Sequence, residues 1–399
     1  MSFPWLKFVI EMKYKTISIT GGGIAGLTTA IALNRVGIQT TLFEAKREIK
    51  PVGAGLGLGA NAMKAFDALG LGFELRNIGR YLKYFVIYDH CGRKIISTGF
   101  NNRIAGNFTI HRAQLHDFLL SHINSGTTIE LGKKLVDTAV LSNCVKLFFS
   151  DGSTHITNYL IIADGIHSPI RQKLFPGAVP RYAGYACWRA VISKGGLNIS
   201  ETSETWGPKG RFGIVPLANS RTYWFACINY PQNDERAKNT SIRDLRENFR
   251  DYRSPIPEIL EQSENVNLIR NDIIDLEPLE SFSSGRIVLV GDAAHATTPN
   301  MGQGACQAIE DAVVLAECMD AQPDFEKAFK MFEERRLKRT RWITTSSRKI
   351  GRIAQIENPF LIHVRNALMR CTPSFVGESQ QKKLESVNFT KSTTLYNKL

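Results

Sequence analysis

The sequence predicts an α/β protein in which a doubly wound, Rossmann-like domain is interrupted by an antiparallel β-sheet and followed by C-terminal helices. Three observations predict this arrangement. A strand, a glycine-rich turn, a helix and a second strand follow one another within residues 16–45. Two later apolar strands each end near an Asp, and open α/β sheets bind ligands at the carboxyl ends of their strands. Residues 178–282 change to short alternating runs rich in aromatic residues, which is typical of antiparallel strands.

The composition is that of an ordinary globular protein. The 399 residues suffice for two domains or for one large fold with an insertion, and no apolar run reaches the length of a membrane span. The first eleven residues lack a small-residue cleavage site, so we expect a loose extension rather than a signal peptide, with the fold beginning near Met12. Seven scattered Cys without a CxxC pair indicate free thiols in a reducing cytoplasm, and no motif has metal-ligand spacing.

The net charge of +13 is concentrated at the C-terminal end. Residues 335–399 hold 14 Lys and Arg against 3 Asp and Glu, which accounts for +11 of the total. The remainder is nearly neutral, which argues against a nucleic-acid groove extending over the whole protein. The basic segment is either a solvated helical face or a contact with a membrane surface or another anion.

The first motif, "KTISITGGGIAGLTTAIALNRVGIQTTLFEA", predicts a dinucleotide site. Gly21, Gly23 and Gly26 have GxGxxG spacing: the first allows a tight turn, the second lets the backbone approach a pyrophosphate, and the third lets helix and strand pack closely. The phosphates would lie at the helix N-terminus. Glu44 ends the second strand, 18 residues after Gly26, where it can bind ribose hydroxyls. The predicted cofactor contacts of this unit are Gly21, Gly23, Ile24, Ala25, Gly26, Glu44 and Ala45.

The second motif, "YLIIADGIHSPIRQKLF", is another buried strand that ends in Asp164 and Gly165. Ser168 and Arg171 follow on a predicted short helix. Asp164 and Arg171 are predicted cofactor contacts, and a plain Asp-Gly turn is the structural alternative.

The third motif, "GDAAHATTPNMGQG", places Asp292 at the end of the strand "RIVLV" and starts a long helix near Gly304. A carboxylate can accept hydrogen bonds from ribityl hydroxyls, and a helix N-terminus can stabilise negative charge on a reduced flavin ring. We therefore expect Asp292, Gly302, Gln303 and Gly304 to contact a flavin. His295 is expected to pack or cap rather than to act as a base.

Together these motifs resemble the FAD-dependent aromatic hydroxylases, the group built like p-hydroxybenzoate hydroxylase, over about residues 15–370. "HRAQLHDFLL" also matches, and the resemblance implies that Arg112 contacts the ribityl and phosphate region of FAD. "EAKREIKPVGAGLGLGANAMKAFDALGL" and "RYAGYACWRAVI" resemble most closely the bacterial FAD-dependent urate hydroxylases, then the zeaxanthin epoxidase and hydroxybenzoate 6-hydroxylase groups.

The resemblance implies one FAD domain with an inserted substrate sheet. No second GxGxxG follows a strand, so NADH or NADPH would bind transiently, partly near residues 164–171. The expected organisation is an FAD-binding domain of residues 12–80, 100–177 and 284–334, a substrate domain of residues 81–99 and 178–283, a C-terminal helical segment of residues 335–385, and a disordered tail of residues 386–399. Ile350, Ile353, Ile356 and Phe360 recur at helical spacing and should pack on the body of the protein.

The predicted catalytic residues are Arg211 and Tyr223 in the substrate half, and Pro299 and Asn300 in the flavin-loop motif. The resemblance to the urate hydroxylases implies that Arg211 and Tyr223 contact the substrate. In "TYWFACIN", Tyr223, Phe225 and Cys227 should share the face toward the flavin, while the other face packs on helices. Arg211, like Arg189, is either a strand-edge residue or a partner for an acidic or carbonyl-bearing substrate. The urate hydroxylases place an acid where this chain has Asn300, so heteroaromatic or phenolic acids rank first as substrates, urate-like purines second and long isoprenoids third.

The predicted function is an FAD-dependent, NAD(P)H-consuming monooxygenase. It would hydroxylate a small aromatic or heteroaromatic substrate with O2 through a flavin C4a-hydroperoxide, as a cytoplasmic monomer or homodimer without nucleic acid or an integral membrane segment. The alternatives are a flavin-dependent reductase, dehydrogenase or epoxidase that acts on a larger apolar substrate, and a non-enzymatic flavin sensor or anion-binding scaffold.

Overall fold

A six-stranded, mostly parallel sheet forms the centre of one half of the molecule. In the computed structural model, residues 15–48, 53–99, 108–193, 197, 199, 201–387 and 389 are described. The strands lie in the order β18 (Ser283–Ser284), β19 (Ile287–Leu289), β12 (Tyr159–Ile162), β1 (Ile17–Thr20), β2 (Thr40–Glu44) and β8 (Thr127–Leu131). All four residues of β1 and of β12 are buried, as their apolar and β-branched sequences predict. Only β18 runs antiparallel to its neighbour.

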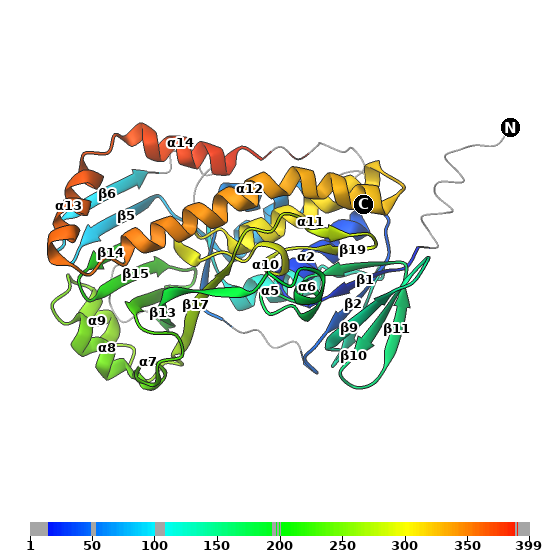
Figure 1. Cartoon of the computed structure of the whole chain (residues 1–399). Helices are drawn as coiled ribbons and strands as arrows, with labels where there is room; N and C mark the ends of the chain where they lie inside the picture. The colour runs from blue at the N-terminus through cyan, green and yellow to red at the C-terminus, as the bar shows by residue number, and fades with distance from the viewer. Residues whose placement is uncertain are drawn as a thin grey trace.

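Helices cover this sheet and small antiparallel sheets flank it (Figure 1). The helices are α2 (Ile24–Arg35), α3 (Ala60–Ala68), α4 (Gly72–Ile78), α5 (Arg112–Ser121), α6 (Pro169–Leu174), α10 (Asp292–His295), α11 (Gly304–Ala321) and α12 (Phe325–Ala354). The small sheets are β3 (Gly55–Leu58), β7 (Phe108–His111) and β4 (Arg80–Tyr81), and β9 (Leu135–Val140), β10 (Val145–Phe149) and β11 (Thr154–Thr157). A 3-10 turn, η1 (Pro299–Met301), precedes α11. Helix α11 packs between α2, α3 and α12.

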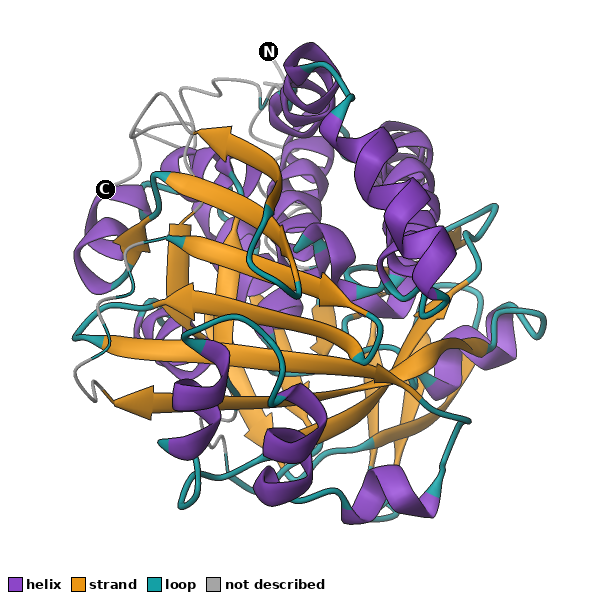
Figure 2. Ribbon diagram, turned by 90° about the vertical axis from the view of Figure 1, so that its left-hand side faces the viewer, coloured by secondary structure: helices purple, strands orange, loops and turns teal. Residues whose placement is uncertain are grey.

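A seven-stranded sheet forms the other half of the molecule (Figure 2). Its order is β17 (Ile269–Leu276), β13 (Pro180–Ser193), β16 (Arg221–Asn229), β15 (Gly210–Pro216), β14 (Thr202–Gly207), β5 (Tyr84–Asp89) and β6 (Lys94–Gly99). Its pairs are antiparallel except β14 with β5. Segments about a hundred residues apart therefore build one sheet.

The two faces of this sheet have different partners, as the alternation in "TYWFACIN" predicts. Trp224 and Ala226 belong to a core with Trp188 and with the helices α7 (Glu235–Asn239), α8 (Ile242–Phe249) and α9 (Ile256–Glu261). Cys227 and Phe225 lie on the opposite face with Tyr185. The prediction that the two faces differ and that one packs on helices is confirmed, while the orientation of the other face toward the flavin stays a prediction.

Helix α12 runs across the molecule from the six-stranded to the seven-stranded sheet, and α13 (Pro359–Arg370) and α14 (Ser374–Glu385) follow it (Figure 1). It crosses residue 335, where we expected the C-terminal segment to begin. The predicted packing of Ile353 and Phe360 is wrong, because these side chains are 46% and 73% exposed. The helical spacing breaks at Gln355, and Asn358 caps a new helix. Residues 388 and 390–399 of the expected tail lie outside the described residues.

Candidate FAD and substrate site

The glycine turn after β1 is shaped by backbone contacts. Gly21 has a φ of +100°, and a Cβ there would overlap the carbonyl of Ala163. A Cβ on Gly26 would overlap the carbonyl of Gly21, so these two glycines are required by the chain itself. Nothing in the chain lies within 4 Å of a Cβ on Gly23, which is the N-cap of α2 and has no side-chain cap. The open helix N-terminus fits a pyrophosphate.

Glu44, at the end of β2, stabilises this turn through hydrogen bonds to its carboxylate. Its Oε2 accepts the N–H of Gly22 at 2.6 Å and its Oε1 accepts that of Lys46 at 2.9 Å. Ala45 is exposed beside it, whereas Ile24 is buried and Ala25 half-buried at the start of α2. The sequence analysis missed His116, whose Nε2 lies 2.7 Å from the carbonyl oxygen of Gly22.

The predicted ribityl contacts lie on two helix starts. Arg112 begins α5 with an exposed side chain, and the Asp292 side chain is exposed at the start of α10. Desolvation by the surrounding protein nevertheless raises the pKa of Asp292, while the charges of His295 and Arg112 act to lower it. A Cβ on Gly304 would lie 3.9 Å from Asp292 Oδ1. The carboxylate and the N-terminus of α11 are therefore adjacent, as the third motif predicts.

The loop before α11 offers its backbone rather than its side chains. Gly302 is exposed and adopts a φ of +63°, and Pro299 begins η1 and is also exposed. The Gln303 side chain is 4% exposed and its Oε1 accepts hydrogen bonds from Asn61 and Gln307. Because that side chain points inward, contact with a flavin at Gln303 has to use its backbone. The first N–H groups of α11 have no partners within the helix.

Buried Asp311 holds α10 in place. Its Oδ2 accepts the N–H of Gly291 at 2.8 Å and lies 2.6 Å from Nε2 of His295, while its Oδ1 accepts Nε of Arg336 at 2.6 Å. Burial raises the pKa of Asp311, but His295 and Arg336 outweigh it, so the net pKa is lowered. His295 therefore has a structural partner, which agrees with the expectation of a packing role.

Asp164 and Arg171 lie together at the end of β12. Ser168 caps α6 by accepting the N–H of Arg171 at 3.2 Å. Burial raises the pKa of Asp164 to about 6, although the Ser168 hydroxyl and the charge of Arg171 both act to lower it. Among the described residues, neither Asp164 Oδ1 nor the two terminal nitrogens of Arg171 has a hydrogen-bond partner, although all three are buried. Unpaired buried polar atoms of both signs fit a polar ligand.

On the substrate side, Arg211 and Asn300 contact each other. Asn300 Oδ1 accepts from Arg211 Nη2 and, at 3.0 Å, from the Tyr185 hydroxyl. Asn300 Nδ2 donates to Thr298 Oγ1 at 2.9 Å and to the Ser347 carbonyl at 2.8 Å. Both polar atoms of the Asn300 side chain are thus engaged, and they join the flavin loop to β13, β15 and α12.

Arg211 is 2% exposed, and its charge is compensated within the chain. Its Nη1 lies 3.5 Å from Glu204 Oε2, and its guanidinium lies 5.3 Å from the ring centre of Tyr185. Sequence analysis missed Tyr185 and Glu204. Tyr185 could have been found from its spacing, because it is two residues before Cys187, which lies opposite Cys227 on the neighbouring strand. Glu204 gave no signal, since its pairing depends on the register of β14 with β15.

Tyr223 lies on the same face as Arg211. A Cβ on Gly55 would lie 2.5 Å from the Tyr223 ring, so the glycine allows β3 to pack directly on that ring. Burial raises the pKa of Tyr223 well above its usual value, which keeps the phenol protonated. Arg189 donates to the Asn271 side chain on β17.

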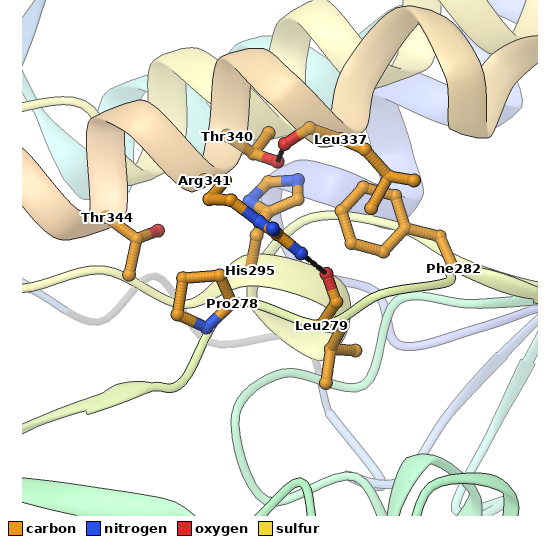
Figure 3. A pocket seen from close by; sticks show the side chains of 8 residues that line it. All are labelled: Pro278, Leu279, Phe282, His295, Leu337, Thr340, Arg341 and Thr344. Atoms are coloured by element: carbon orange, nitrogen blue, oxygen red, sulfur yellow. Dashed lines mark hydrogen bonds between the residues drawn. The ribbon is translucent and has the colours of Figure 1, made fainter.

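A separate crevice lies between α10 and α12 (Figure 3). Its lining includes His295, Phe282 and Arg341, whose Nη2 donates to the Leu279 carbonyl at 3.4 Å. It has no room for a water molecule and is lined by none of the residues predicted to bind FAD or substrate. Within the described ranges there is also no cluster of His, Cys, Asp or Glu that could hold a metal ion.

The fold and the site define a flavin-dependent oxidoreductase. The chain belongs to the FAD binding domain family, whose model matches residues 13–322. It is 37% identical to an aurachin C monooxygenase/isomerase of Stigmatella aurantiaca and 31% identical to a 2-heptyl-3-hydroxy-4(1H)-quinolone synthase of Pseudomonas aeruginosa. Each match covers 90% of this chain and 94% of the relative. Klebsiella pneumoniae HpxO, solved with FAD and uric acid, superposes with a TM-score of 0.86 at 26% identity, over 94% of this chain and 97% of HpxO.

These comparisons confirm the predicted α/β fold and the resemblance to FAD-dependent aromatic hydroxylases. The protein is a FAD-dependent monooxygenase of the aromatic hydroxylase type, with NAD(P)H as the co-substrate typical of the family. They do not support the reductase or dehydrogenase alternative. Among the residues that the structure describes, no helix is long and apolar enough to span a bilayer.

Proposed function

We propose that the protein uses FAD, NAD(P)H and O2 to hydroxylate a neutral heteroaromatic ring of the 4-quinolone type that carries an apolar side chain. One observation of the site carries the proposal: Arg211 is already paired with Glu204 and Asn300. A substrate carboxylate would have to compete with Glu204 for a charge that is almost fully buried. A neutral ring with a carbonyl and an N–H would not compete with Glu204 for that charge.

Some of the relatives support the same substrate class. One of them is named for a 3-hydroxy-4-quinolone with a heptyl chain. The substrate-facing sheet supplies aromatic rings, with those of Tyr223 and Phe225 5.9 Å apart, and these suit a flat apolar ligand. This proposal moves phenolic acids, which ranked first on the sequence alone, below a neutral heteroaromatic ring.

The residues have distinct roles in this proposal. Bound FAD would supply the redox chemistry, held by the N-termini of α2 and α11 and by Glu44, Arg112 and Asp292. Arg211 and Asn300 would position the flavin loop against the sheet, while the half-buried ring of Tyr223 would line the substrate space. We further propose a cytoplasmic monomer or homodimer, and the seven free thiols suit that compartment.

A substrate panel under 18O2 tests the proposal. We expect 2-alkyl-4-quinolones to stimulate NAD(P)H oxidation and to gain one labelled oxygen atom, measured by product mass. Phenolic acids and urate serve as competing candidates at equal concentration. Faster coupled turnover of a phenolic acid or of urate than of any quinolone would overturn the substrate class.

A further inference from the structure

Helix α13 exposes an apolar stripe. Phe360, Leu361, Val364 and Leu368 are 73%, 49%, 41% and 67% exposed. At 100° per residue these four positions fall within about 100° of one another around the helix. The opposite side is held by the protein, where Ile362, Arg365 and Asn366 are buried. A folded helix thus presents large apolar side chains outward.

The same helix is fixed firmly to the substrate sheet. Arg365 donates to the carbonyls of Ile353 and Ala354 at the end of α12, and its guanidinium lies 5.2 Å from the ring centre of Trp206. Arg370 donates to Asp89 at 3.0 Å and to the Lys94 carbonyl at 3.2 Å. The exposed stripe is therefore not a frayed end.

The surroundings of the stripe are basic. Arg93, Lys94 and Arg370 lie at one end of α13, where Asp89, the acid that two of them contact, is itself buried. Lys349 and Arg352 are exposed on the last turns of α12, at the other end. Between residues 349 and 370 the sequence contains one acid, Glu357. An apolar stripe bordered by Lys and Arg is typical of helices that lie in the interface of an anionic bilayer.

A second copy of the chain fits the stripe less well. The exposed apolar side chains of one 12-residue helix offer on the order of a few hundred Å², whereas a standard interface buries about 800 Å² per partner. Because both ends of the helix are basic, two copies packed through the stripe would also bring like charges together.

We propose that α13 is a docking helix that seats the protein on an anionic phospholipid surface, from which it takes its lipophilic substrate. The docking is inferred from the apolar stripe and the basic residues around it. The identity of the substrate taken from the bilayer rests on the proposed function. The position suits delivery, because a series of side-chain contacts places α13 close to the residues of the substrate site. Arg365 lies over Trp206, whose Nε1 donates to Glu204 at 2.8 Å, and Glu204 pairs with Arg211 beside the flavin loop.

Vesicle flotation of the FAD-loaded full chain tests the docking. We expect binding to phosphatidylglycerol-containing vesicles, weaker binding to pure phosphatidylcholine, and loss of binding at high salt. Phe360→Ser combined with Leu368→Ser should lower the partition coefficient by roughly tenfold for each side chain removed. Phe73→Ser is the matched control, because Phe73 is 78% exposed on α4 and should leave binding unchanged.

The outcomes are distinct. No flotation of the wild type, or equal flotation of the double variant, overturns the proposal. A wild-type dimer that the double variant converts to a monomer, measured by light scattering, also overturns it and assigns the stripe to a second copy. If the double variant misfolds, the single variants replace it. Turnover of a soluble quinolone should be the same in all variants, and its absence throughout would refute the proposed function while leaving the flotation result valid.

Discussion

At the scale of single residues, the buried carboxyl of Asp164 couples folding to pH. Its pKa of about 6 in the folded protein is raised by burial above the usual value of 3.8. A raised carboxyl pKa means that the folded state prefers the protonated form. The stabilising contribution is therefore complete below about pH 4 and is lost as the pH rises through about 6.

Asp164→Asn should remove this dependence in the flavin-free protein. The unfolding free energy of the variant, relative to the wild type, should rise between pH 4 and pH 7.5 by at most about 3 kcal/mol. Urea unfolding at the two pH values measures it. A constant difference between variant and wild type would show that Asp164 ionises normally in the folded chain.

A substitution at Gly23 should affect FAD binding without affecting the stability of the fold. The chain leaves the space around it open, so Gly23→Ala should change the unfolding free energy of the apoprotein by less than about 0.5 kcal/mol. An added methyl where the pyrophosphate is expected should weaken FAD binding by about tenfold or more, measured by fluorescence titration. The control is Gly57→Ala, which also meets no chain atom within 4 Å. Unchanged FAD affinity in Gly23→Ala would place the pyrophosphate elsewhere.

At the scale of elements, α12 packs directly on the flavin loop. A Cβ on Gly351 would overlap Asn300 Nδ2, so the glycine sets how closely the helix and η1 approach. The Asn300 contacts to Thr298 and to the Ser347 carbonyl depend on the same approach.

Gly351→Ala should therefore destabilise the protein by about 1–3 kcal/mol through overpacking, despite the better helix propensity of Ala. FAD binding should weaken as well, because the loop before α11 would shift. Gly377→Ala is the matched control: Gly377 lies in α14 with no atom within 4 Å of its Cβ, so this change should be neutral or stabilising. Denaturant midpoints and FAD titrations of both variants check the prediction. Equal stability of the two would mean that Asn300 moves aside without cost.

At the scale of the whole molecule, the parts that could be predicted from sequence are those fixed by local patterns. The turn at Gly21 and the Asp292 position follow from motifs that combine a strand end with a helix start. The partners of Asn300 could not be predicted, because Tyr185, Arg211 and Ser347 come from three separate elements and meet only in the folded chain. For the same reason, the sequence alone does not show that Arg211 is paired with Glu204.

The engagement of Asn300 by α12 has a consequence for the order of events during synthesis. The Ser347 carbonyl that holds Asn300 is 47 residues further along the chain. At about 5–20 residues per second, the ribosome makes this segment roughly 2–10 s after the flavin loop. A nascent chain thus carries its glycine turn and Asp292 well before that loop can be held against the sheet. Stable capture of the flavin would then be among the last steps of maturation, and premature termination before α12 would yield a colourless chain.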